Sequence, residues 1–316
     1  MEAGGRGDLG TPGSADGWRE LVSGLPSPAV VVGTDGGAAG LAAVEWAAAE
    51  AAARSCDLSI VHAQPALVRA HQRRTGDGPP AHTSSDPLLE EAVGRARAIA
   101  SDTTVHARSV VGAAVPALLG QRADLLVVGN TARRTGSRSG GPVCLGVAAY
   151  AMCPVAVVRL KSPESAAAPG IGTRRRREAG RVVVGIGGSS PSVSMLEFGF
   201  RAAAQRRVDL TALVARPPDL VDDVLHEVAP AVGVESLSWP RLVTAIARLR
   251  LAFPTVSATT VCRHGSAADV LVEESDGAAL LVVGQRDRSV LGRRLFGSVT
   301  HSVLNRADCP VAIVRR

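Results

Sequence analysis

The sequence predicts an α/β protein of two tandem doubly wound domains, each a five-stranded parallel sheet with helices on both faces. Short β-branched runs bounded by Gly or Pro alternate with longer segments rich in Ala, Leu and Arg, which is the pattern of strands joined by helical crossovers. Near-continuous apolar runs such as residues 280–283 suit strands that are covered on both faces. Right-handed crossovers then place a layer of helices on each side of the sheet.

Three sequence blocks occur twice in the same order, which indicates a duplicated domain. The paired blocks are VVVGTDGG and VVVGIGGS, ADLLVVG and AALLVVG, and CPVAVVR and CPVAIVR, which start at Val30 and Val182, Ala123 and Ala278, and Cys153 and Cys309. The chain has 316 residues, 46% of them hydrophobic, which is enough apolar material for two ordinary domains. We therefore expect a disordered leader at 1–27, domains at 28–160 and 181–316, and a basic flexible linker at 161–180.

Each element follows from a local signal. The expected strands are the short β-branched runs near 29–33, 58–63, 104–110, 124–129 and 155–159, and near 181–186, 208–214, 256–262, 279–284 and 311–315. The expected helices are the Ala-, Leu- and Arg-rich segments near 39–54, 87–100, 113–121 and 142–151, and near 191–205, 236–251, 266–275 and 297–306. Pro142 can start its helix, because the first helical N–H is unpaired in any case. Cys153 and Cys309 each precede a Pro and an apolar run, so we expect them to be small packing residues at strand entrances.

The composition argues against a membrane-spanning, secreted or nucleic-acid-binding protein. No stretch of 18 residues is free of charged and polar breakers, and Met1 begins an acidic, Gly-rich leader instead of a basic signal region. The net charge of +6, from 35 basic and 29 acidic residues, is concentrated around Arg174–Arg177 in the linker, and the single Tyr150 makes no stacking platform. The five cysteines form no CxxC and no metal-type spacing. We expect a cytoplasmic protein with reduced thiols and no metal site.

A candidate phosphate site follows the fourth strand of the second domain. Ligands of an open parallel sheet bind beyond the carboxyl ends of its strands. Gly284 lets the chain turn out of the strand, and Gly297 and Ser298 open a helix whose free N–H groups and positive dipole end favour a phosphate. Ser298 and Thr300 can add hydroxyl donors, and Val299 lies between them in the first turn.

This arrangement resembles the universal stress protein family, whose nucleotide-binding members carry G-x2-G-x9-G-[S/T] after the fourth strand. Gly284, Gly297 and Ser298 match the motif, whereas Asp287 stands where its second Gly belongs. The resemblance covers about 28–160 and 180–316, and it implies an adenine nucleotide alpha hydrolase-like fold with ATP or ADP as the ligand. It leaves open whether Mg accompanies the nucleotide.

The resemblance also implies an acidic residue at the end of the first strand, which contacts the adenosine portion in nucleotide-binding relatives. Asp35 fills this position in the first domain, and Gly187 is its counterpart in the second. Gly129 begins the first domain's loop, but that loop reaches Gly141 one residue short, with Pro142 where Ser belongs. Neither domain is complete, and the better phosphate loop is in the second. Because Asp35 and Ser298 belong to different domains, we expect them to lie in separate sheets, which argues against one shared site.

We therefore expect a stress-response regulatory protein that binds ATP or ADP, with a nucleotide-free interaction scaffold of the same fold as the alternative. No nucleophile and base set, G-x4-G-K-[ST], HExxH or strand-turn-helix G-x-S-x-G is evident, so we expect no enzyme, although slow ATP hydrolysis or autophosphorylation stays open. The apolar terminal strands need cover, and, as in dimers of the family, they could pair with each other within the chain. A homo-oligomer and an unidentified protein partner also stay open.

Overall fold

The computed structural model describes the two repeated halves of the chain. The described residues are 29–64, 86–130, 141–159, 180–187, 193–216, 239–285, 289–290, 293–294 and 297–315. The expected leader, most of the expected linker with Arg174–Arg177, the predicted phosphate loop of the first unit at 131–140, and Asp287 lie outside them. Within the described ranges, no helix is both long enough and apolar enough to cross a membrane.

The first unit has its strands and helices where the sequence predicts them. They are β1 (Ala29–Gly33), α2 (Ala38–Arg54), β2 (Asp57–Gln64), α4 (Pro87–Ile99), β3 (Val105–Val111), α5 (Ala114–Leu119), β4 (Leu125–Asn130), α6 (Pro142–Tyr150) and β5 (Val155–Arg159). The five strands are parallel, in the order β3-β2-β1-β4-β5. Helix α2 is rich in Ala, the strongest helix former, and it ends at Ser55, which adopts a left-handed φ of 52°.

The second unit repeats this order. It contains β6 (Val182–Ile186), α8 (Val193–Arg206), β7 (Leu210–Arg216), α10 (Trp239–Ala252), β8 (Ala258–His264), α11 (Ala267–Glu274), β9 (Leu280–Gln285), α12 (Ser298–Arg306) and β12 (Val311–Arg315). Strands β7 and β8 begin two residues later than expected; before β7, α8 runs to Arg206 and Arg207 turns the chain with a φ of 54°. A small antiparallel hairpin of β10 (Ser289–Val290) and β11 (Arg293–Arg294) was not predicted, because strands of two residues carry no periodic signal.

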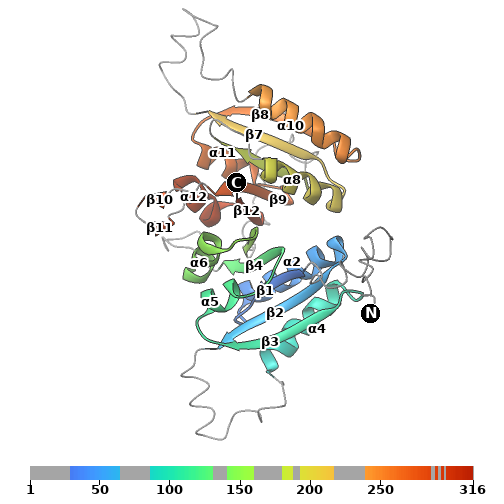
Figure 1. The fold of residues 1–316 in the computed structure, drawn as a ribbon, viewed down its shortest axis with the longest axis vertical. Helices are drawn as coiled ribbons and strands as arrows, with labels where there is room; N and C mark the ends of the chain where they lie inside the picture. Colours follow the sequence, from blue (N-terminus) through green and yellow to red (C-terminus); the bar gives the residue numbers. More distant parts are fainter. Residues whose placement is uncertain are drawn as a thin grey trace, which may run out of the picture.

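Both units belong to one ten-stranded sheet, in the order β3-β2-β1-β4-β5-β12-β9-β6-β7-β8 (Figure 1). The terminal strands β5 and β12 are antiparallel neighbours, with Val157 opposite Val311 and Val155 opposite Ile313. The expectation of separate sheets is therefore wrong, because these two apolar edge strands pair with each other and join the two five-stranded sheets into one. Since the junction is antiparallel, the strands of the two units end at opposite edges of the sheet. The first edge is defined as the side of the sheet that contains the C-terminal ends of the first unit's strands. The second edge is the opposite side, which contains the C-terminal ends of the second unit's strands.

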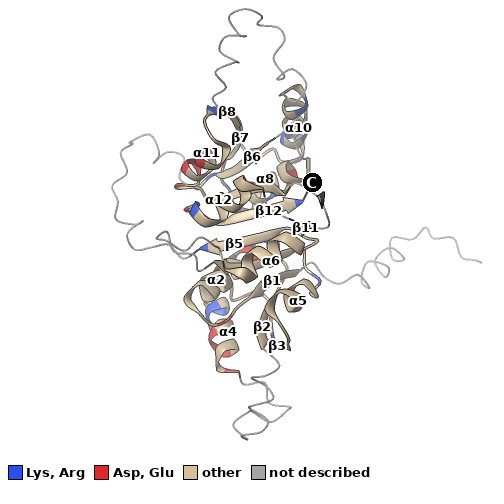
Figure 2. Cartoon of the chain, turned by 90° about the vertical axis from the view of Figure 1, so that its left-hand side faces the viewer, with Lys and Arg blue, Asp and Glu red and all other residues tan. Residues whose placement is uncertain are grey.

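Helices cover both faces of the sheet and so confirm the doubly wound fold (Figures 1 and 2). On one face, the core under α5, α6, α11 and α12 is continuous across both units. On the other face, α2 and α4 cover one core and α8 and α10 cover a second, and Trp46 and Phe198 pack against both cores. The helices carry residues of both charge signs (Figure 2). In α4, the exposed side chains of Glu91 and Arg95 form an ion pair of 3.2 Å.

Candidate functional site

Asp35 lies at the first edge, in the turn between β1 and α2. Its side chain is exposed, and its Oδ1 accepts a hydrogen bond of 3.0 Å from the N–H of Gly37, the N-cap residue of α2. The preceding Thr34 is buried, and its Oγ1 accepts a bond of 3.1 Å from the N–H of Gly36. Two successive side chains therefore hold the backbone of this turn, and the Asp35 carboxylate remains accessible to solvent.

Gly129 lets the start of α2 pack directly on the end of β4. A Cβ at this position would lie 2.4 Å from the carbonyl oxygen of Ala39 and 2.9 Å from the nitrogen of Gly40. A Cβ at Gly40 would in turn lie 2.8 Å from Asp35 Oδ1. The structure thus brings Asp35 and Gly129 together at the first edge, and the close backbone contact at Gly129 exists whether or not a ligand binds.

A group of polar side chains that was not predicted lies at the neighbouring strand ends. The carboxylate of Asp86, the N-cap of α4, accepts bonds of 3.2 Å from Gln64 Nε2 and 3.1 Å from Ser109 Oγ, while its other oxygen accepts 3.2 Å from the N–H of Leu88. His62 Nδ1 lies 3.0 Å from the carbonyl oxygen of Thr34. An Asp directly before Pro87 is a recognisable helix start, and that signal could have identified Asp86.

In the first unit, the helix that follows the fourth strand is α6. It begins at Pro142, after the N-cap residue Gly141, which has no side chain that could cap the helix. Pro142 removes one of the N–H groups that a phosphate would use. The counterpart in the second unit begins at Ser298, after Gly297 with φ −62° and ψ 151°, also without a side-chain cap. Among the described residues, no atom lies within 4 Å of a Cβ placed at Gly297, and Gly297 and Ser298 are both exposed at the start of α12.

The second-edge residues differ in their exposure. Ser298 is exposed, Val299 is half-buried and packs against the core, and Thr300 is buried with 6% exposure. Ser298 is therefore the more accessible of the two hydroxyls. Gly284 lies within β9, one residue before its end, and Gly187, the counterpart of Asp35, is exposed.

The predicted residues fall into two groups that do not meet. Asp35 and Gly129 lie at the first edge, where β1 and β4 end. Gly284 lies at the second edge, and the chain enters α12 at Ser298 from that side. Because antiparallel pairing of β5 and β12 turns one unit over relative to the other, Asp35 and Ser298 cannot contribute to one site.

A hollow of about 280 Å³ lies between the two units, beside the end of β12. Its walls are Met152, Cys153, Pro154, Ser194, Glu197, Phe198, Arg201, Val314 and Arg315. None of the predicted phosphate-site residues lines it.

All five cysteines lie in the described part of the chain, and each is a free thiol. Burial raises the pKa of Cys144 to about 12, and burial also raises the pKa of Cys153 and Cys56. No group of three or more His, Cys, Asp or Glu side chains among the described residues is arranged to hold a metal ion. The two buried thiols, Cys144 and Cys309, act as small apolar packing groups in the folded protein.

Two copies of one doubly wound unit, joined through their terminal strands and each with a glycine near the end of its fourth strand, define a tandem α/β protein. The sequence model of the universal stress protein family matches residues 28–159 and 178–315, and the chain belongs to this family.

Known relatives agree with this assignment. The chain is 32% identical over 314 residues to universal stress protein Rv2623 of Mycobacterium tuberculosis, covering 93% of this chain and 99% of that protein. It is 29% identical over 306 residues to universal stress protein Mb2028c of Mycobacterium bovis, covering 91% and 97%. The crystal structure of a universal stress protein from Archaeoglobus fulgidus shares the fold, with a TM-score of 0.61 and 13% identity, covering 91% of this chain and 98% of that one.

Proposed function

We propose that this protein is a stress-response regulator that binds ATP or ADP at the start of α12, and that it is not an enzyme. The observation that carries the proposal is the open, exposed start of this helix at Gly297 and Ser298. The first N–H groups of a helix have no partner within the helix, and together with the helix dipole they attract a phosphate. Ser298 adds a hydroxyl beside them.

The contrast between the two units favours the second one. Helix α6 begins at Pro142, which has no N–H and no hydroxyl, whereas α12 begins at Ser298, which has both. The same contrast makes Asp35 a weaker candidate contact, because the unit that contains it has the poorer helix start.

A nucleotide-free interaction scaffold is the second candidate, and one specific observation favours it. Asp35 and Ser298 are the two residues that best match nucleotide-binding relatives, yet they lie at opposite edges of the sheet. Each edge therefore has only part of the expected set, and Gly187 offers no carboxylate at the second edge.

The experiment is isothermal titration of the full chain with ATP, with and without magnesium, alongside Ser298→Ala and Asp35→Ala. We expect binding that Ser298→Ala weakens at least tenfold and that Asp35→Ala leaves within twofold. Ser302→Ala is the matched control, because it removes a hydroxyl one turn further along the same helix. Absence of both binding heat and a thermal shift at millimolar ATP would overturn the nucleotide proposal and favour the scaffold.

A further inference from the structure

The C-terminal end of α12 is capped by a side chain of the other unit. Asn130 is the last residue of β4 and is 2% exposed, and its Nδ2 donates a hydrogen bond of 2.9 Å to the carbonyl oxygen of Leu304. The N–H four residues further on, that of Asp308, donates instead to Ser275 Oγ at 2.9 Å. Carbonyls in the last turn of a helix lack intrahelical partners, so Asn130 supplies what α12 cannot.

The C-terminal end of α6 is capped in the same way from the opposite side. Gln285 is the last residue of β9 and is 7% exposed, and its Nε2 donates 3.1 Å to the carbonyl oxygen of Ala149. Guanidinium groups add to both caps: Arg315 donates 3.2 Å to Ala149, and Arg159 donates 3.0 Å to the carbonyl oxygen of Ala307. Positive charge at a helix C-terminus also complements the helix dipole.

The capping residues occupy special positions in the chain. Asn130 directly follows Gly129, and Gln285 directly follows Gly284. Each is therefore the last residue of its unit's fourth strand, from which the chain continues toward α6 or α12. Helix α12 therefore begins after the loop that follows β9, and its last turn contacts Asn130, the residue from which the loop after β4 starts. Helix α6 makes the reciprocal connection. Because the units are turned over relative to each other, these two helices link the two edges of the sheet.

We propose that α12 couples the two edges, so that a ligand at Ser298 alters the first edge through the hydrogen bond between Asn130 and Leu304. This inference rests on the proposed nucleotide site. A helix of nine residues, about 13 Å long at 1.5 Å per residue, moves as one body when its start is displaced. The carbonyl oxygen of Leu304 at the other end of the helix then moves, and this changes its hydrogen bond with the buried side-chain amide of Asn130. Asn130 is a positioning residue in this scheme, and the coupling must act equally in both directions.

The test is NMR of the ¹⁵N-labelled full chain during titration with ATP. The signals followed are the backbone amide of Gly129 and the side-chain amide of Asn130, which is assigned by its loss in Asn130→Ser. We expect both signals to shift with the same apparent Kd as the heat of binding. In Asn130→Ser, ATP should still bind, while the shift at Gly129 should fall at least threefold. Asn305→Ala is the matched control, since it removes an amide that bonds within α12, to His301 at 3.0 Å, and it should keep the Gly129 shift.

The outcomes separate this inference from the proposed function. Binding without a shift at Gly129 overturns the coupling and leaves the nucleotide site intact. A Gly129 shift that keeps its wild-type apparent Kd in Ser298→Ala means that ATP reaches the first edge directly, which also overturns the coupling.

If the wild-type chain binds no ATP, Val299→Gly tests the coupling without a ligand, because Gly weakens the first turn of α12. The Gly129 signal must then move in the wild-type background and stay in place in the Asn130→Ser background. An unmoved signal in both backgrounds rejects the coupling.

Discussion

Glu50 of α2 and Arg206 of α8 form an ion pair across the junction of the two units. The Glu50 side chain is only 2% exposed and also pairs with Arg54 at 2.6 Å. The two arginines lie over aromatic rings of the opposite unit: Arg206 is 5.6 Å from the ring centre of Trp46, and Arg54 is 5.5 Å from that of Phe198. Arg54 and Arg206 occupy equivalent positions in the two repeats, as do Trp46 and Phe198, so one carboxylate neutralises a pair of related arginines at the junction.

Replacing this carboxylate should destabilise the protein strongly. Glu50→Ala leaves two largely buried guanidinium groups without their shared partner, and we expect a loss of about 3 kcal/mol in the free energy of unfolding. Urea denaturation monitored by circular dichroism measures the loss. Glu197→Ala is the control: it breaks an exposed pair with Arg201 at 3.0 Å and should cost about 0.5 kcal/mol or less. Equal losses in the two variants would contradict a structural role for the buried network.

Two glycine substitutions should change stability in opposite directions. Gly129→Ala places a Cβ 2.4 Å from a backbone oxygen of α2, and relief requires the helix to move off the sheet, so we expect a loss of about 2 kcal/mol. Gly94→Ala lies in the exposed middle of α4, where no atom of the described residues is within 4 Å of the new Cβ, and we expect a gain of about 0.7 kcal/mol from helix propensity. Thermal unfolding of both variants tests the contrast. A neutral Gly129→Ala would mean that α2 does not pack as closely as described.

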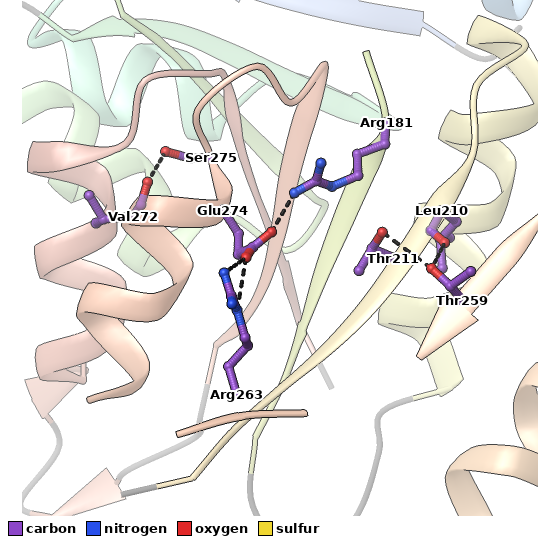
Figure 3. Close-up of polar contacts among 8 residues, drawn as sticks. All are labelled: Arg181, Leu210, Thr211, Thr259, Arg263, Val272, Glu274 and Ser275. Carbon is purple, nitrogen blue, oxygen red and sulfur yellow. Dashed lines mark hydrogen bonds and ion pairs between the residues drawn. The ribbon is translucent and has the colours of Figure 1, made fainter. Parts of the chain in front are cut away.

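Ser275 should contribute more to stability than its size suggests. It is fully buried at the end of α11, where its hydroxyl donates a hydrogen bond of 2.6 Å to the carbonyl oxygen of Val272 (Figure 3). The same hydroxyl accepts a bond of 2.9 Å from the N–H of Asp308. Ser275→Ala leaves that N–H without its hydroxyl acceptor, and we expect a loss of about 2 kcal/mol in the free energy of unfolding. Thr244→Ala, which removes an exposed hydroxyl from α10, should stay within about 0.5 kcal/mol of the wild type. Chemical denaturation in parallel distinguishes the two.

Thiol reactivity should follow burial. The folded protein raises the pKa of Cys144 from 9.0 to about 12, so its thiol stays protonated and unreactive in the native state, whereas Cys262 is exposed on β8. Iodoacetamide at pH 8, followed by mass spectrometry, should label Cys262 first and Cys144 only after denaturation. The sign for stability follows from the same shift: the contribution of Cys144 is complete below pH 9 and is lost as the pH rises toward 12. Native labelling of Cys144 at the rate of Cys262 would contradict this assignment.

Much of the fold follows from local sequence. The β-branched runs at 182–186 and 280–285 become strands because they suit a pleated surface that is covered on both faces. Pro142 and Ser298 start their helices as expected, since a helix start depends on a few adjacent residues. The contacts of Asn130 and Gln285 could not be foreseen, because each amide binds a carbonyl more than 130 residues away in the chain.

The sequence by itself determined that this chain is a tandem universal stress protein, because the repeated blocks record strand, loop and helix in one order. It also determined which residues open the second loop helix, since Gly297 and Ser298 act through their own backbone and side chains. Only the tertiary structure decided how the two units relate. The antiparallel pairing of β5 with β12 places Asp35 and Ser298 at opposite edges of one sheet. That outcome depends on the direction in which two distant strands meet, and direction is a property of the packed edges, which local residue patterns do not encode.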